Sequence, residues 1–328
     1  MRGGAGCSAP HDRTGCGAIE FRFEVECGNI RPRASFVDEG ARSTSMRGAP
    51  MSMQKQGYVL PLTAEETRRL HNQAHYLDRC TDPLLARYVR PGMHCVELGC
   101  GVGSSTQSIR QILGRTGTLT TVDQGVAFLD YTRQRLDQTG NDGVTFVHAS
   151  AEYYAFPAEL DLVFGRAVLH HTRDPWDVYA RAAAALERGG FIIFQEPAMS
   201  AIFRHALPRG VESLWRWYIA LGEQGGFHFD IGDDLARFAT RAGLEIVEMA
   251  GYEPILVSDE DRSVYPKLLR VIGDQLLVAG LASREALEKV QDELEEAVRE
   301  GIPMSYIPFI HCVAMRPLHA APGGEPAH

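Results

Sequence analysis

Lysine is scarce in this chain, and so is any concentration of positive charge. Only three of its 33 cationic side chains are lysines, and the 328 residues carry a formal net charge of -9. No stretch gathers basic residues on one face. An acidic chain without a basic patch is poorly suited to grip a phosphate backbone. We therefore expect no nucleic-acid partner.

Long apolar runs and paired cysteines are also absent. No run approaches the roughly 20 apolar residues that a membrane helix requires, and the N-terminal segment lacks the apolar region of a secretory signal. The seven cysteines are odd in number and contain no C-x-x-C pair, which fits neither a disulfide framework nor a zinc site. We expect a soluble, cytoplasmic protein without a membrane segment or a metal. Cys95 and Cys312 lie in apolar runs and are expected in the core.

The pattern of residues changes along the chain. Residues 1–50 are rich in Gly, Arg, Ser and Pro, which is typical of a disordered segment or of an extension before the true start. Residues 51–91 are expected to form a helical lid segment. One helix should begin with a capping box at Thr63, and a second short helix should open at Pro83. Residues 317–328 are expected to form a disordered tail.

Residues 92–316 alternate short apolar strands with helices. Strands are expected at 94–98, 118–122, 144–147, 160–164, 191–194, 244–249 and 307–315. Parallel strands joined by crossover helices predict an α/β fold, a Rossmann-like doubly wound sheet of seven strands. The last strand should run antiparallel to its neighbour at the edge. Helical insertions are expected at about 199–230 and 258–303.

The two insertions carry amphipathic helices. In the first, Trp215 lies on the apolar face and is expected in the core, whereas Trp217 lies off that face and is the better candidate for a pocket wall. The second is interrupted near Gly280. It ends in an acidic amphipathic helix at residues 286–300.

A glycine-rich turn follows the first of these strands. Residues 97–103 read Glu-Leu-Gly-Cys-Gly-Val-Gly at the junction of a strand and a helix. Glycine lets the backbone bend there and lets a ligand approach it closely. Asp123 ends the next strand, 20 residues after Gly103, where a carboxylate can accept hydrogen bonds from a ribose diol. The alternatives are a tight packing turn and a helix N-cap.

This E-x-G-x-G-x-G pattern resembles the first motif of class I S-adenosylmethionine-dependent methyltransferases. Residues 146–152 resemble the third-strand motif of that family, residues 160–171 its fourth-strand motif with a Leu-His-His run, and residues 189–196 its fifth. The resemblance extends over about residues 58–316. It implies that the cofactor is S-adenosylmethionine.

The resemblance also implies which residues bind or frame the cofactor: Glu97, Gly99, Gly101, Gly103, Asp123, Gln124, Ser150, Ala151 and Arg166. The glycines would line its methionine and ribose part, and Glu97 would organise the turn. Asp123 would bind the ribose hydroxyls, and Gln124 would flank adenine. Ser150 stands where family members often have Asp, and a neutral hydroxyl accepts a hydrogen bond more weakly. Arg166 would lie near the methionine carboxylate.

Three residues are candidates for catalysis. Methyl transfer from a sulfonium needs alignment of the reactants, and a hydroxyl or carbon acceptor also needs a base. His170 and His171 follow the carboxyl end of a strand, where doubly wound folds bind ligands, and Glu196 should face the same rim. We place His170 first as general base, because histidine titrates near neutral pH. The alternatives are a helix cap, packing under the cofactor, or a surface ion pair.

Six further residues are candidates for the acceptor pocket: Tyr58, His75, Tyr76, Trp217, Phe227 and His228. The first three precede the core, where members of the family often fold an N-terminal segment over the cofactor. Phe227 and His228 follow two glycines, a composition that suits a mobile pocket wall. The alternative for such aromatic residues is simple packing.

The implied function is transfer of a methyl group from S-adenosylmethionine to the oxygen or carbon of a small, largely apolar acceptor in secondary metabolism. One alternative is a cyclase that keeps the fold and the cofactor. A second is a non-catalytic assembly protein, or a homodimer, that uses the helix at 286–300 as its contact surface. An RNA or protein methyltransferase is a third, although the missing basic patch disfavours RNA.

Overall fold

The computed structural model describes residues 63–139 and 143–319. The predicted disordered segment 1–50, the candidate Tyr58 and most of the predicted tail 317–328 lie outside these ranges. Within them, no helix is both long enough and apolar enough to cross a membrane.

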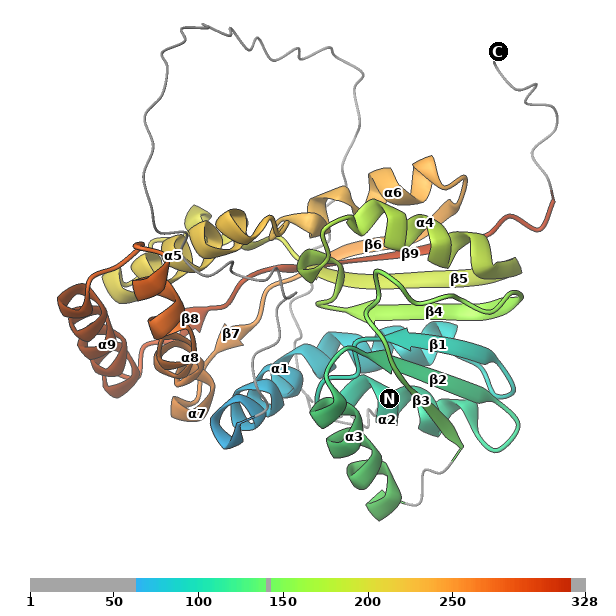
Figure 1. Cartoon of the computed structure of the whole chain (residues 1–328), viewed down its shortest axis with the longest axis horizontal. Helices are drawn as coiled ribbons and strands as arrows, with labels where there is room; N and C mark the ends of the chain where they lie inside the picture. The colour runs from blue at the N-terminus through green and yellow to red at the C-terminus, as the bar shows by residue number, and fades with distance from the viewer. Residues whose placement is uncertain (1–62, 140–142, 320–328) are drawn as a thin grey trace, which may run out of the picture.

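Seven strands form one sheet in the order β3-β2-β1-β4-β5-β9-β6 (Figure 1). Their bounds are β1 His94–Leu98, β2 Thr118–Asp123, β3 Val144–His148, β4 Leu160–Arg166, β5 Leu186–Pro197, β6 Glu245–Tyr252 and β9 Phe309–Met315. Strands β1 to β5 are parallel, and β9 is antiparallel to both β5 and β6. The predicted doubly wound sheet is confirmed. The last strand of the chain lies one place inside the edge, however, because β6 occupies the edge.

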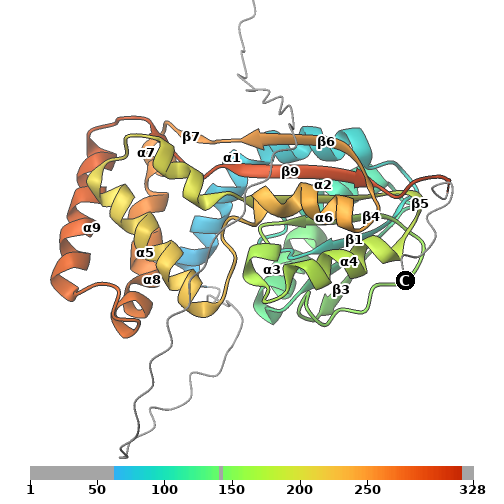
Figure 2. The ribbon, with the colours of Figure 1, turned by 90° about the horizontal axis from the view of Figure 1, so that it is seen from above.

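Helices cover both faces of this sheet (Figure 2). They are α1 Ala64–Tyr88, α2 Ser104–Leu113, α3 Val126–Thr139, α4 Pro175–Ala185 and α6 Leu235–Arg241. Successive side chains of a strand point to opposite faces, so a strand covered on both sides is apolar throughout. In β1, Cys95 packs with α1 and α2, whereas Val96 packs with α4 and α6. Cys95 and Cys312 are 0% and 1% exposed, which confirms them as core residues.

Helix α1 is one continuous helix of 25 residues with Pro83 inside it. Thr63 is the N-cap of α1, as predicted, since its hydroxyl accepts a hydrogen bond from the Glu66 N–H at 3.0 Å. The Glu66 carboxylate, the other half of the predicted capping box, pairs with Arg69. The predicted break at Pro83 is wrong. Proline removes one backbone donor from a helix, but Leu84 and Leu85 are fully buried against the sheet and stabilise the helix through the proline.

The two insertions form a helical unit with its own core. It contains α5 Arg209–Gly225, α7 Asp259–Arg262, α8 Val264–Val278 and α9 Arg284–Arg299, with the short strands β7 Ile255–Leu256 and β8 Met304–Ser305. Figures 1 and 2 place these helices beyond one end of the sheet, with the N-terminal half of α1 reaching toward them. The apolar face of α9, including Val290 and Leu294, is buried in this unit. That face is therefore covered within the chain and does not support the assembly alternative.

Candidate active site

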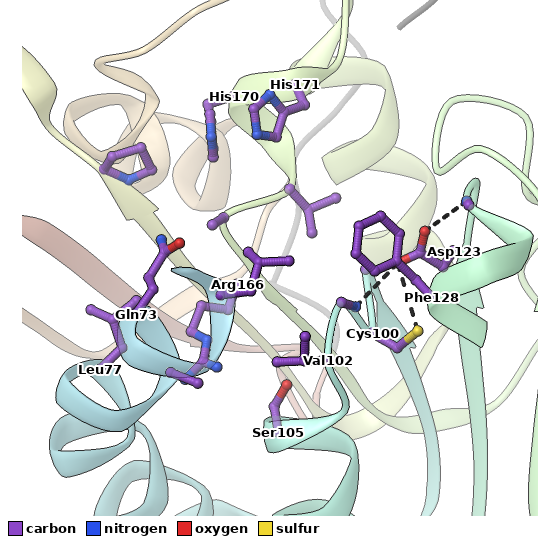
Figure 3. Close-up of a pocket in the computed structure, with 18 of the residues that line it drawn as sticks. Gln73, Leu77, Cys100, Val102, Ser105, Asp123, Phe128, Arg166, His170 and His171 are labelled. Atoms are coloured by element: carbon purple, nitrogen blue, oxygen red, sulfur yellow. Dashed lines mark hydrogen bonds between the residues drawn. The ribbon is translucent and has the colours of Figure 1, made fainter. Parts of the chain in front are cut away.

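A cavity of about 230 Å³ lies between the carboxyl ends of the parallel strands and the helical unit. Its walls come from the loops after β1, β2, β3, β4 and β5, from one face of α1, and from α5, α8 and the segment before β9. Figure 3 shows Asp123 and Phe128 on one side of it and Gln73 on the other, with His170 and His171 above. The fold therefore brings the predicted cofactor motifs and the candidate bases together at one cavity.

The three motif glycines differ in what surrounds them. All have positive φ, at 73° for Gly99, 50° for Gly101 and 77° for Gly103. A Cβ on Gly99 would lie 2.4 Å from Val168, and one on Gly103 would lie 2.7 Å from Thr132, whereas one on Gly101 would meet nothing within 4 Å. Gly99 and Gly101 line the cavity, but Gly103 caps α2 outside it. Gly101 is therefore the position where the missing side chain leaves room for a ligand.

Glu97 lies behind the turn and not on the cavity wall. Its carboxylate is fully buried and accepts hydrogen bonds from Ser105 at 2.6 Å, Thr106 at 2.7 Å and Thr121 at 2.9 Å. Burial raises the pKa of Glu97, and these three hydroxyls oppose the shift. Glu97 therefore holds β2 and the first turn of α2 in place around the glycines.

Asp123 lines the cavity at the end of β2. One carboxylate oxygen accepts the Gly125 N–H at 2.8 Å and the other accepts the Gly101 N–H at 3.2 Å. Burial raises the pKa of Asp123, and the backbone donors oppose the shift. Gln124, Ser150 and Ala151 lie on the same part of the wall. The Ser150 hydroxyl also accepts the Glu152 N–H at 3.2 Å.

Arg166 lines the cavity and joins β4 to α1. It donates to Asp78 at 2.7 Å and to the Thr81 hydroxyl at 2.9 Å. Asp78 also accepts a hydrogen bond from Ser104 at the start of α2. These contacts fix α1 across the end of the sheet. The sequence contained no motif that indicated the α1 partners.

The chain turns sharply after β4 and surrounds Glu196. Ala167 has φ of 56°, in the left-handed region that non-glycine residues seldom adopt. The three N–H groups that follow, at residues 168, 169 and 170, donate to the Glu196 carboxylate at 2.9, 2.9 and 3.3 Å. The same carboxylate lies 2.9 Å from Nδ1 of His170. Glu196 is fully buried and does not line the cavity, whereas His170 does.

Burial sets the charge of this pair. It lowers the pKa of His170 to about 3 and raises the pKa of Glu196 to about 7, although the three backbone donors hold the latter down. His170 is therefore neutral near neutral pH. His171 lines the cavity beside it, with the two ring centroids 3.8 Å apart. Burial also lowers the pKa of His171, and the His170 and Arg69 charges lower it further.

Five of the six residues predicted for the acceptor pocket lie away from the wall of this cavity. His75 and His228 are exposed, Trp217 and Phe227 pack on the outside of the helical core, and Tyr76 is buried against Tyr306 behind the wall. None of these five lines the cavity, whereas Trp215 does. The cavity lies on the side of α5 that faces the core of the helical unit. The apolar face of α5 is therefore part of that core and also part of the cavity wall.

Known proteins are similar to this chain in sequence and in fold. The family model described as a methyltransferase domain matches residues 96–194. A ubiquinone biosynthesis O-methyltransferase of Thiobacillus denitrificans is 30% identical over 187 residues, which cover 53% of this chain and 77% of that protein. The chain belongs to the class I S-adenosylmethionine-dependent methyltransferases.

Two further similarities agree with this assignment. A trans-aconitate 2-methyltransferase of Acidovorax sp. is 34% identical to this methyltransferase over 140 residues, 42% of this chain and 52% of that protein. The chain thus spans about half the length of that relative. A proposed methyltransferase of Bacillus halodurans shares the fold, with a TM-score of 0.52 at 16% identity, covering 74% of this chain and 99% of that one.

The residues at one end of the cavity fit S-adenosylmethionine, the methyl donor of this enzyme family. The open space at Gly101 admits a ligand close to the backbone, and the Asp123 carboxylate can accept from hydroxyl groups. Within residues 63–139 and 143–319, no group of His, Cys, Asp and Glu side chains could hold a metal ion.

Sequence reasoning missed most of the cavity wall outside the cofactor motifs. The missed wall residues include Glu66, Arg69, Leu70, Gln73, Ala74, Leu77, Phe128, Trp215, Tyr218, Leu268, Tyr306, Ile307 and Phe309. One signal was available, because the α1 residues recur every three or four positions and so share one helix face. The others come from distant segments that only the folded helical unit brings together.

Proposed function

We propose that this methyltransferase transfers a methyl group to the oxygen or carbon of a small, largely apolar acceptor, of a kind found in secondary metabolism, with His170 as general base. One observation carries the proposal. The cavity that holds the glycine turn and Asp123 also holds His170, whose Nδ1 lies 2.9 Å from the buried Glu196 carboxylate. A donor site and a base therefore face the same enclosed space.

The cofactor residues have distinct proposed roles. Asp123 accepts from the ribose hydroxyls, Gly101 admits the ligand to the backbone, and Gln124 and Ser150 border the adenine. Arg166 faces the methionine carboxylate, and its contacts with Asp78 and Thr81 hold it in place. S-adenosylmethionine supplies a methyl group on a sulfonium, so these residues need only align the reactants.

Glu196 sets the tautomer of His170 in this proposal. When the carboxyl is protonated, it donates to Nδ1, and the imidazole then carries its own proton on Nε2. When the carboxylate is ionised, it accepts from Nδ1–H, and Nε2 has a free lone pair that can take a proton from the acceptor. The second state grows as pH rises through about 7, the pKa of Glu196. Burial lowers the pKa of His170 to about 3, so the expectation that it titrates near neutral pH is not met. In this proposal the ionised Glu196 carboxylate stabilises the imidazolium that forms when His170 takes the proton, and His170 acts as a base only above about pH 7.

The acceptor space is lined mainly by apolar and aromatic residues, including Trp215 and Tyr218 of the helical unit and Phe309 at the start of β9. Such a wall supports a flat or apolar acceptor. The similarity to an O-methyltransferase supports transfer to oxygen. The N-terminal half of α1 crosses the cavity and bonds to α3 through His71 and Tyr131 at 2.6 Å, which supports the lid role expected of residues 51–91.

The test has two stages. Calorimetry should first show that the purified chain binds S-adenosylhomocysteine. A panel of catechols, phenols and aromatic acids is then incubated with S-adenosylmethionine, and mass spectrometry measures methylated product and S-adenosylhomocysteine together. Both should appear in equal amounts with at least one acceptor, and should disappear in His170→Ala. Failure to bind S-adenosylhomocysteine would refute the proposal. A changed substrate without S-adenosylhomocysteine would indicate a cyclase instead.

A further inference from the structure

The acceptor end of the cavity contains an ion pair on α1. Glu66, Arg69 and Gln73 all line the cavity, and their spacing places them on one helix face. Glu66 is 2% exposed and Arg69 is 6% exposed. The rest of this end is mainly aromatic and aliphatic, apart from the two histidines. A buried ion pair on such a wall is unusual, because desolvation makes it costly.

The guanidinium of Arg69 is held in one orientation. Its Nε donates to Glu66 at 2.8 Å, and its Nη2 donates to the other oxygen of that carboxylate at 2.7 Å. Its Nη1 donates to the Gln73 amide oxygen at 3.0 Å. These bonds hold the planar guanidinium in a fixed place. Apolar side chains such as Leu70 and Ala74 are sufficient to pack α1 against its neighbours, so the ion pair is not needed for that packing.

Arg69 lies near the candidate bases and not near the ribose site. Its charge contributes to the lowered pKa of His171, after burial and His170, and opposes the rise that burial causes in the pKa of Tyr306. Figure 3 shows its partner Gln73 across the cavity from Asp123. An acceptor presented to His170 would therefore meet Arg69.

We propose that Arg69, oriented by Glu66 and Gln73, donates a hydrogen bond to an oxygen of the acceptor other than the atom that is methylated. The acceptor is then an apolar or aromatic molecule that also carries a carboxylate or a neutral carbonyl group. Glu66 neutralises the guanidinium, so the recognised oxygen need not be charged. This inference rests on the proposed function, because it assigns the acceptor to the same cavity.

Three catechols that differ at one substituent test the proposal: protocatechuate, its primary carboxamide, and the methylcatechol in which a methyl group replaces the carboxylate. Calorimetry measures their binding to the protein saturated with S-adenosylhomocysteine. The first two should bind roughly tenfold or more tightly than the third, since a hydrogen bond from a charged donor is lost with the methyl compound. Arg69→Met should abolish this preference. Arg68→Met, at the exposed neighbouring position, should keep it.

A second variant separates recognition from folding. Glu66→Gln keeps the shape of the side chain and removes its charge, so the affinity for protocatechuate should rise several-fold relative to the affinity for its carboxamide. A ratio of these two affinities that stays the same or falls would overturn the proposal. So would equal binding, or no binding, of all three catechols to the wild-type protein. Failure to bind S-adenosylhomocysteine would instead count against the proposed function itself.

Discussion

Replacing Asp123 by Asn should weaken binding of S-adenosylhomocysteine by roughly a hundredfold. Hydrogen bonds to a charged group contribute about 1.5–3 kcal/mol each, against about 1 kcal/mol for a neutral pair. The carboxylate can accept from both ribose hydroxyls, whereas an amide retains one weaker acceptor. The net loss is about 3 kcal/mol, which corresponds to roughly a hundredfold in Kd.

The geometry of Asp123 adds a local effect to this loss. Its two oxygens each accept one backbone N–H, from Gly125 at 2.8 Å and from Gly101 at 3.2 Å. In Asn, the NH₂ group must face one of these donors. Circular dichroism and thermal unfolding should therefore accompany the calorimetry, to show that the variant is folded at the temperature of the titration.

A matched control is available on α3. Asp130 is exposed and pairs with Arg133, so Asp130→Asn should leave the affinity within twofold of wild type. Burial raises the pKa of Asp123, so wild-type affinity should decline on acidification at a higher pH than for an ordinary aspartate. A folded Asp123→Asn protein with a Kd within threefold of wild type would refute the assignment of the ribose to this carboxylate.

Glu196→Gln should lower kcat roughly a hundredfold or more with the best acceptor of the panel, because the carboxamide N–H would face Nδ1 and place the proton of His170 on Nε2. Wild-type kcat should rise through about pH 7, and a variant kcat within threefold of wild type would exclude this role for Glu196. Gly101→Ala should weaken S-adenosylhomocysteine binding and lower Tm only through the strain of its left-handed φ of 50°. Gly103→Ala should lower Tm further, by roughly 5 °C, since its Cβ would also lie 2.7 Å from Thr132. Calorimetry and thermal unfolding that gave the opposite order would contradict the assignment of the turn. Urea unfolding can compare the free energy of unfolding of wild type with that of the His170→Asn, Glu196→Gln double variant. Their difference should not change between pH 4.5 and 6.5, the ordinary pKa values of glutamate and histidine, because the folded and the unfolded pair each hold one proton there. It should fall by about 1 kcal/mol as pH drops from 4.5 to 3, because the unfolded pair takes up a second proton while the folded His170 reaches half protonation only near pH 3. A clear slope between pH 4.5 and 6.5 would contradict the shared proton.

The cofactor side of the site could be predicted because its residues are local to the strand ends. Carboxyl ends of parallel strands meet at one edge, so the turn at Gly101 and the residue Asp123 must lie close together once the strand order is known. The apolar runs of β1 and β4 are short, and helices of ten or more residues lie between them in the chain. Such patterns depend on near neighbours in the chain.

The acceptor side could not be predicted in the same way. The choice between Trp215 and Trp217 assumed that a core face and a pocket wall are different faces of α5. In the folded protein the cavity lies inside the helical unit, so Trp215 belongs to both. The prediction of a new helix at Pro83 was wrong for a related reason. Burial of Leu84 and Leu85 against distant segments stabilises α1 by more than the proline destabilises it. Both errors arise from contacts between segments that are far apart in sequence.

Three acid–base pairs border the cavity, and two of them connect different parts of the fold. Arg69 and Glu66 lie on α1, Arg166 joins β4 to Asp78, and His170 follows β4 and meets Glu196 at the end of β5. The two arginine–carboxylate pairs hold directed donors without adding net charge to the cavity. Removing one member leaves its partner as an uncompensated charge, which is costly where the pair is buried. Single substitutions should therefore reduce stability and specificity together. Changing the acceptor of this enzyme should require replacing both members of a pair, with Glu66 and Arg69 the pair most directly exposed to the acceptor.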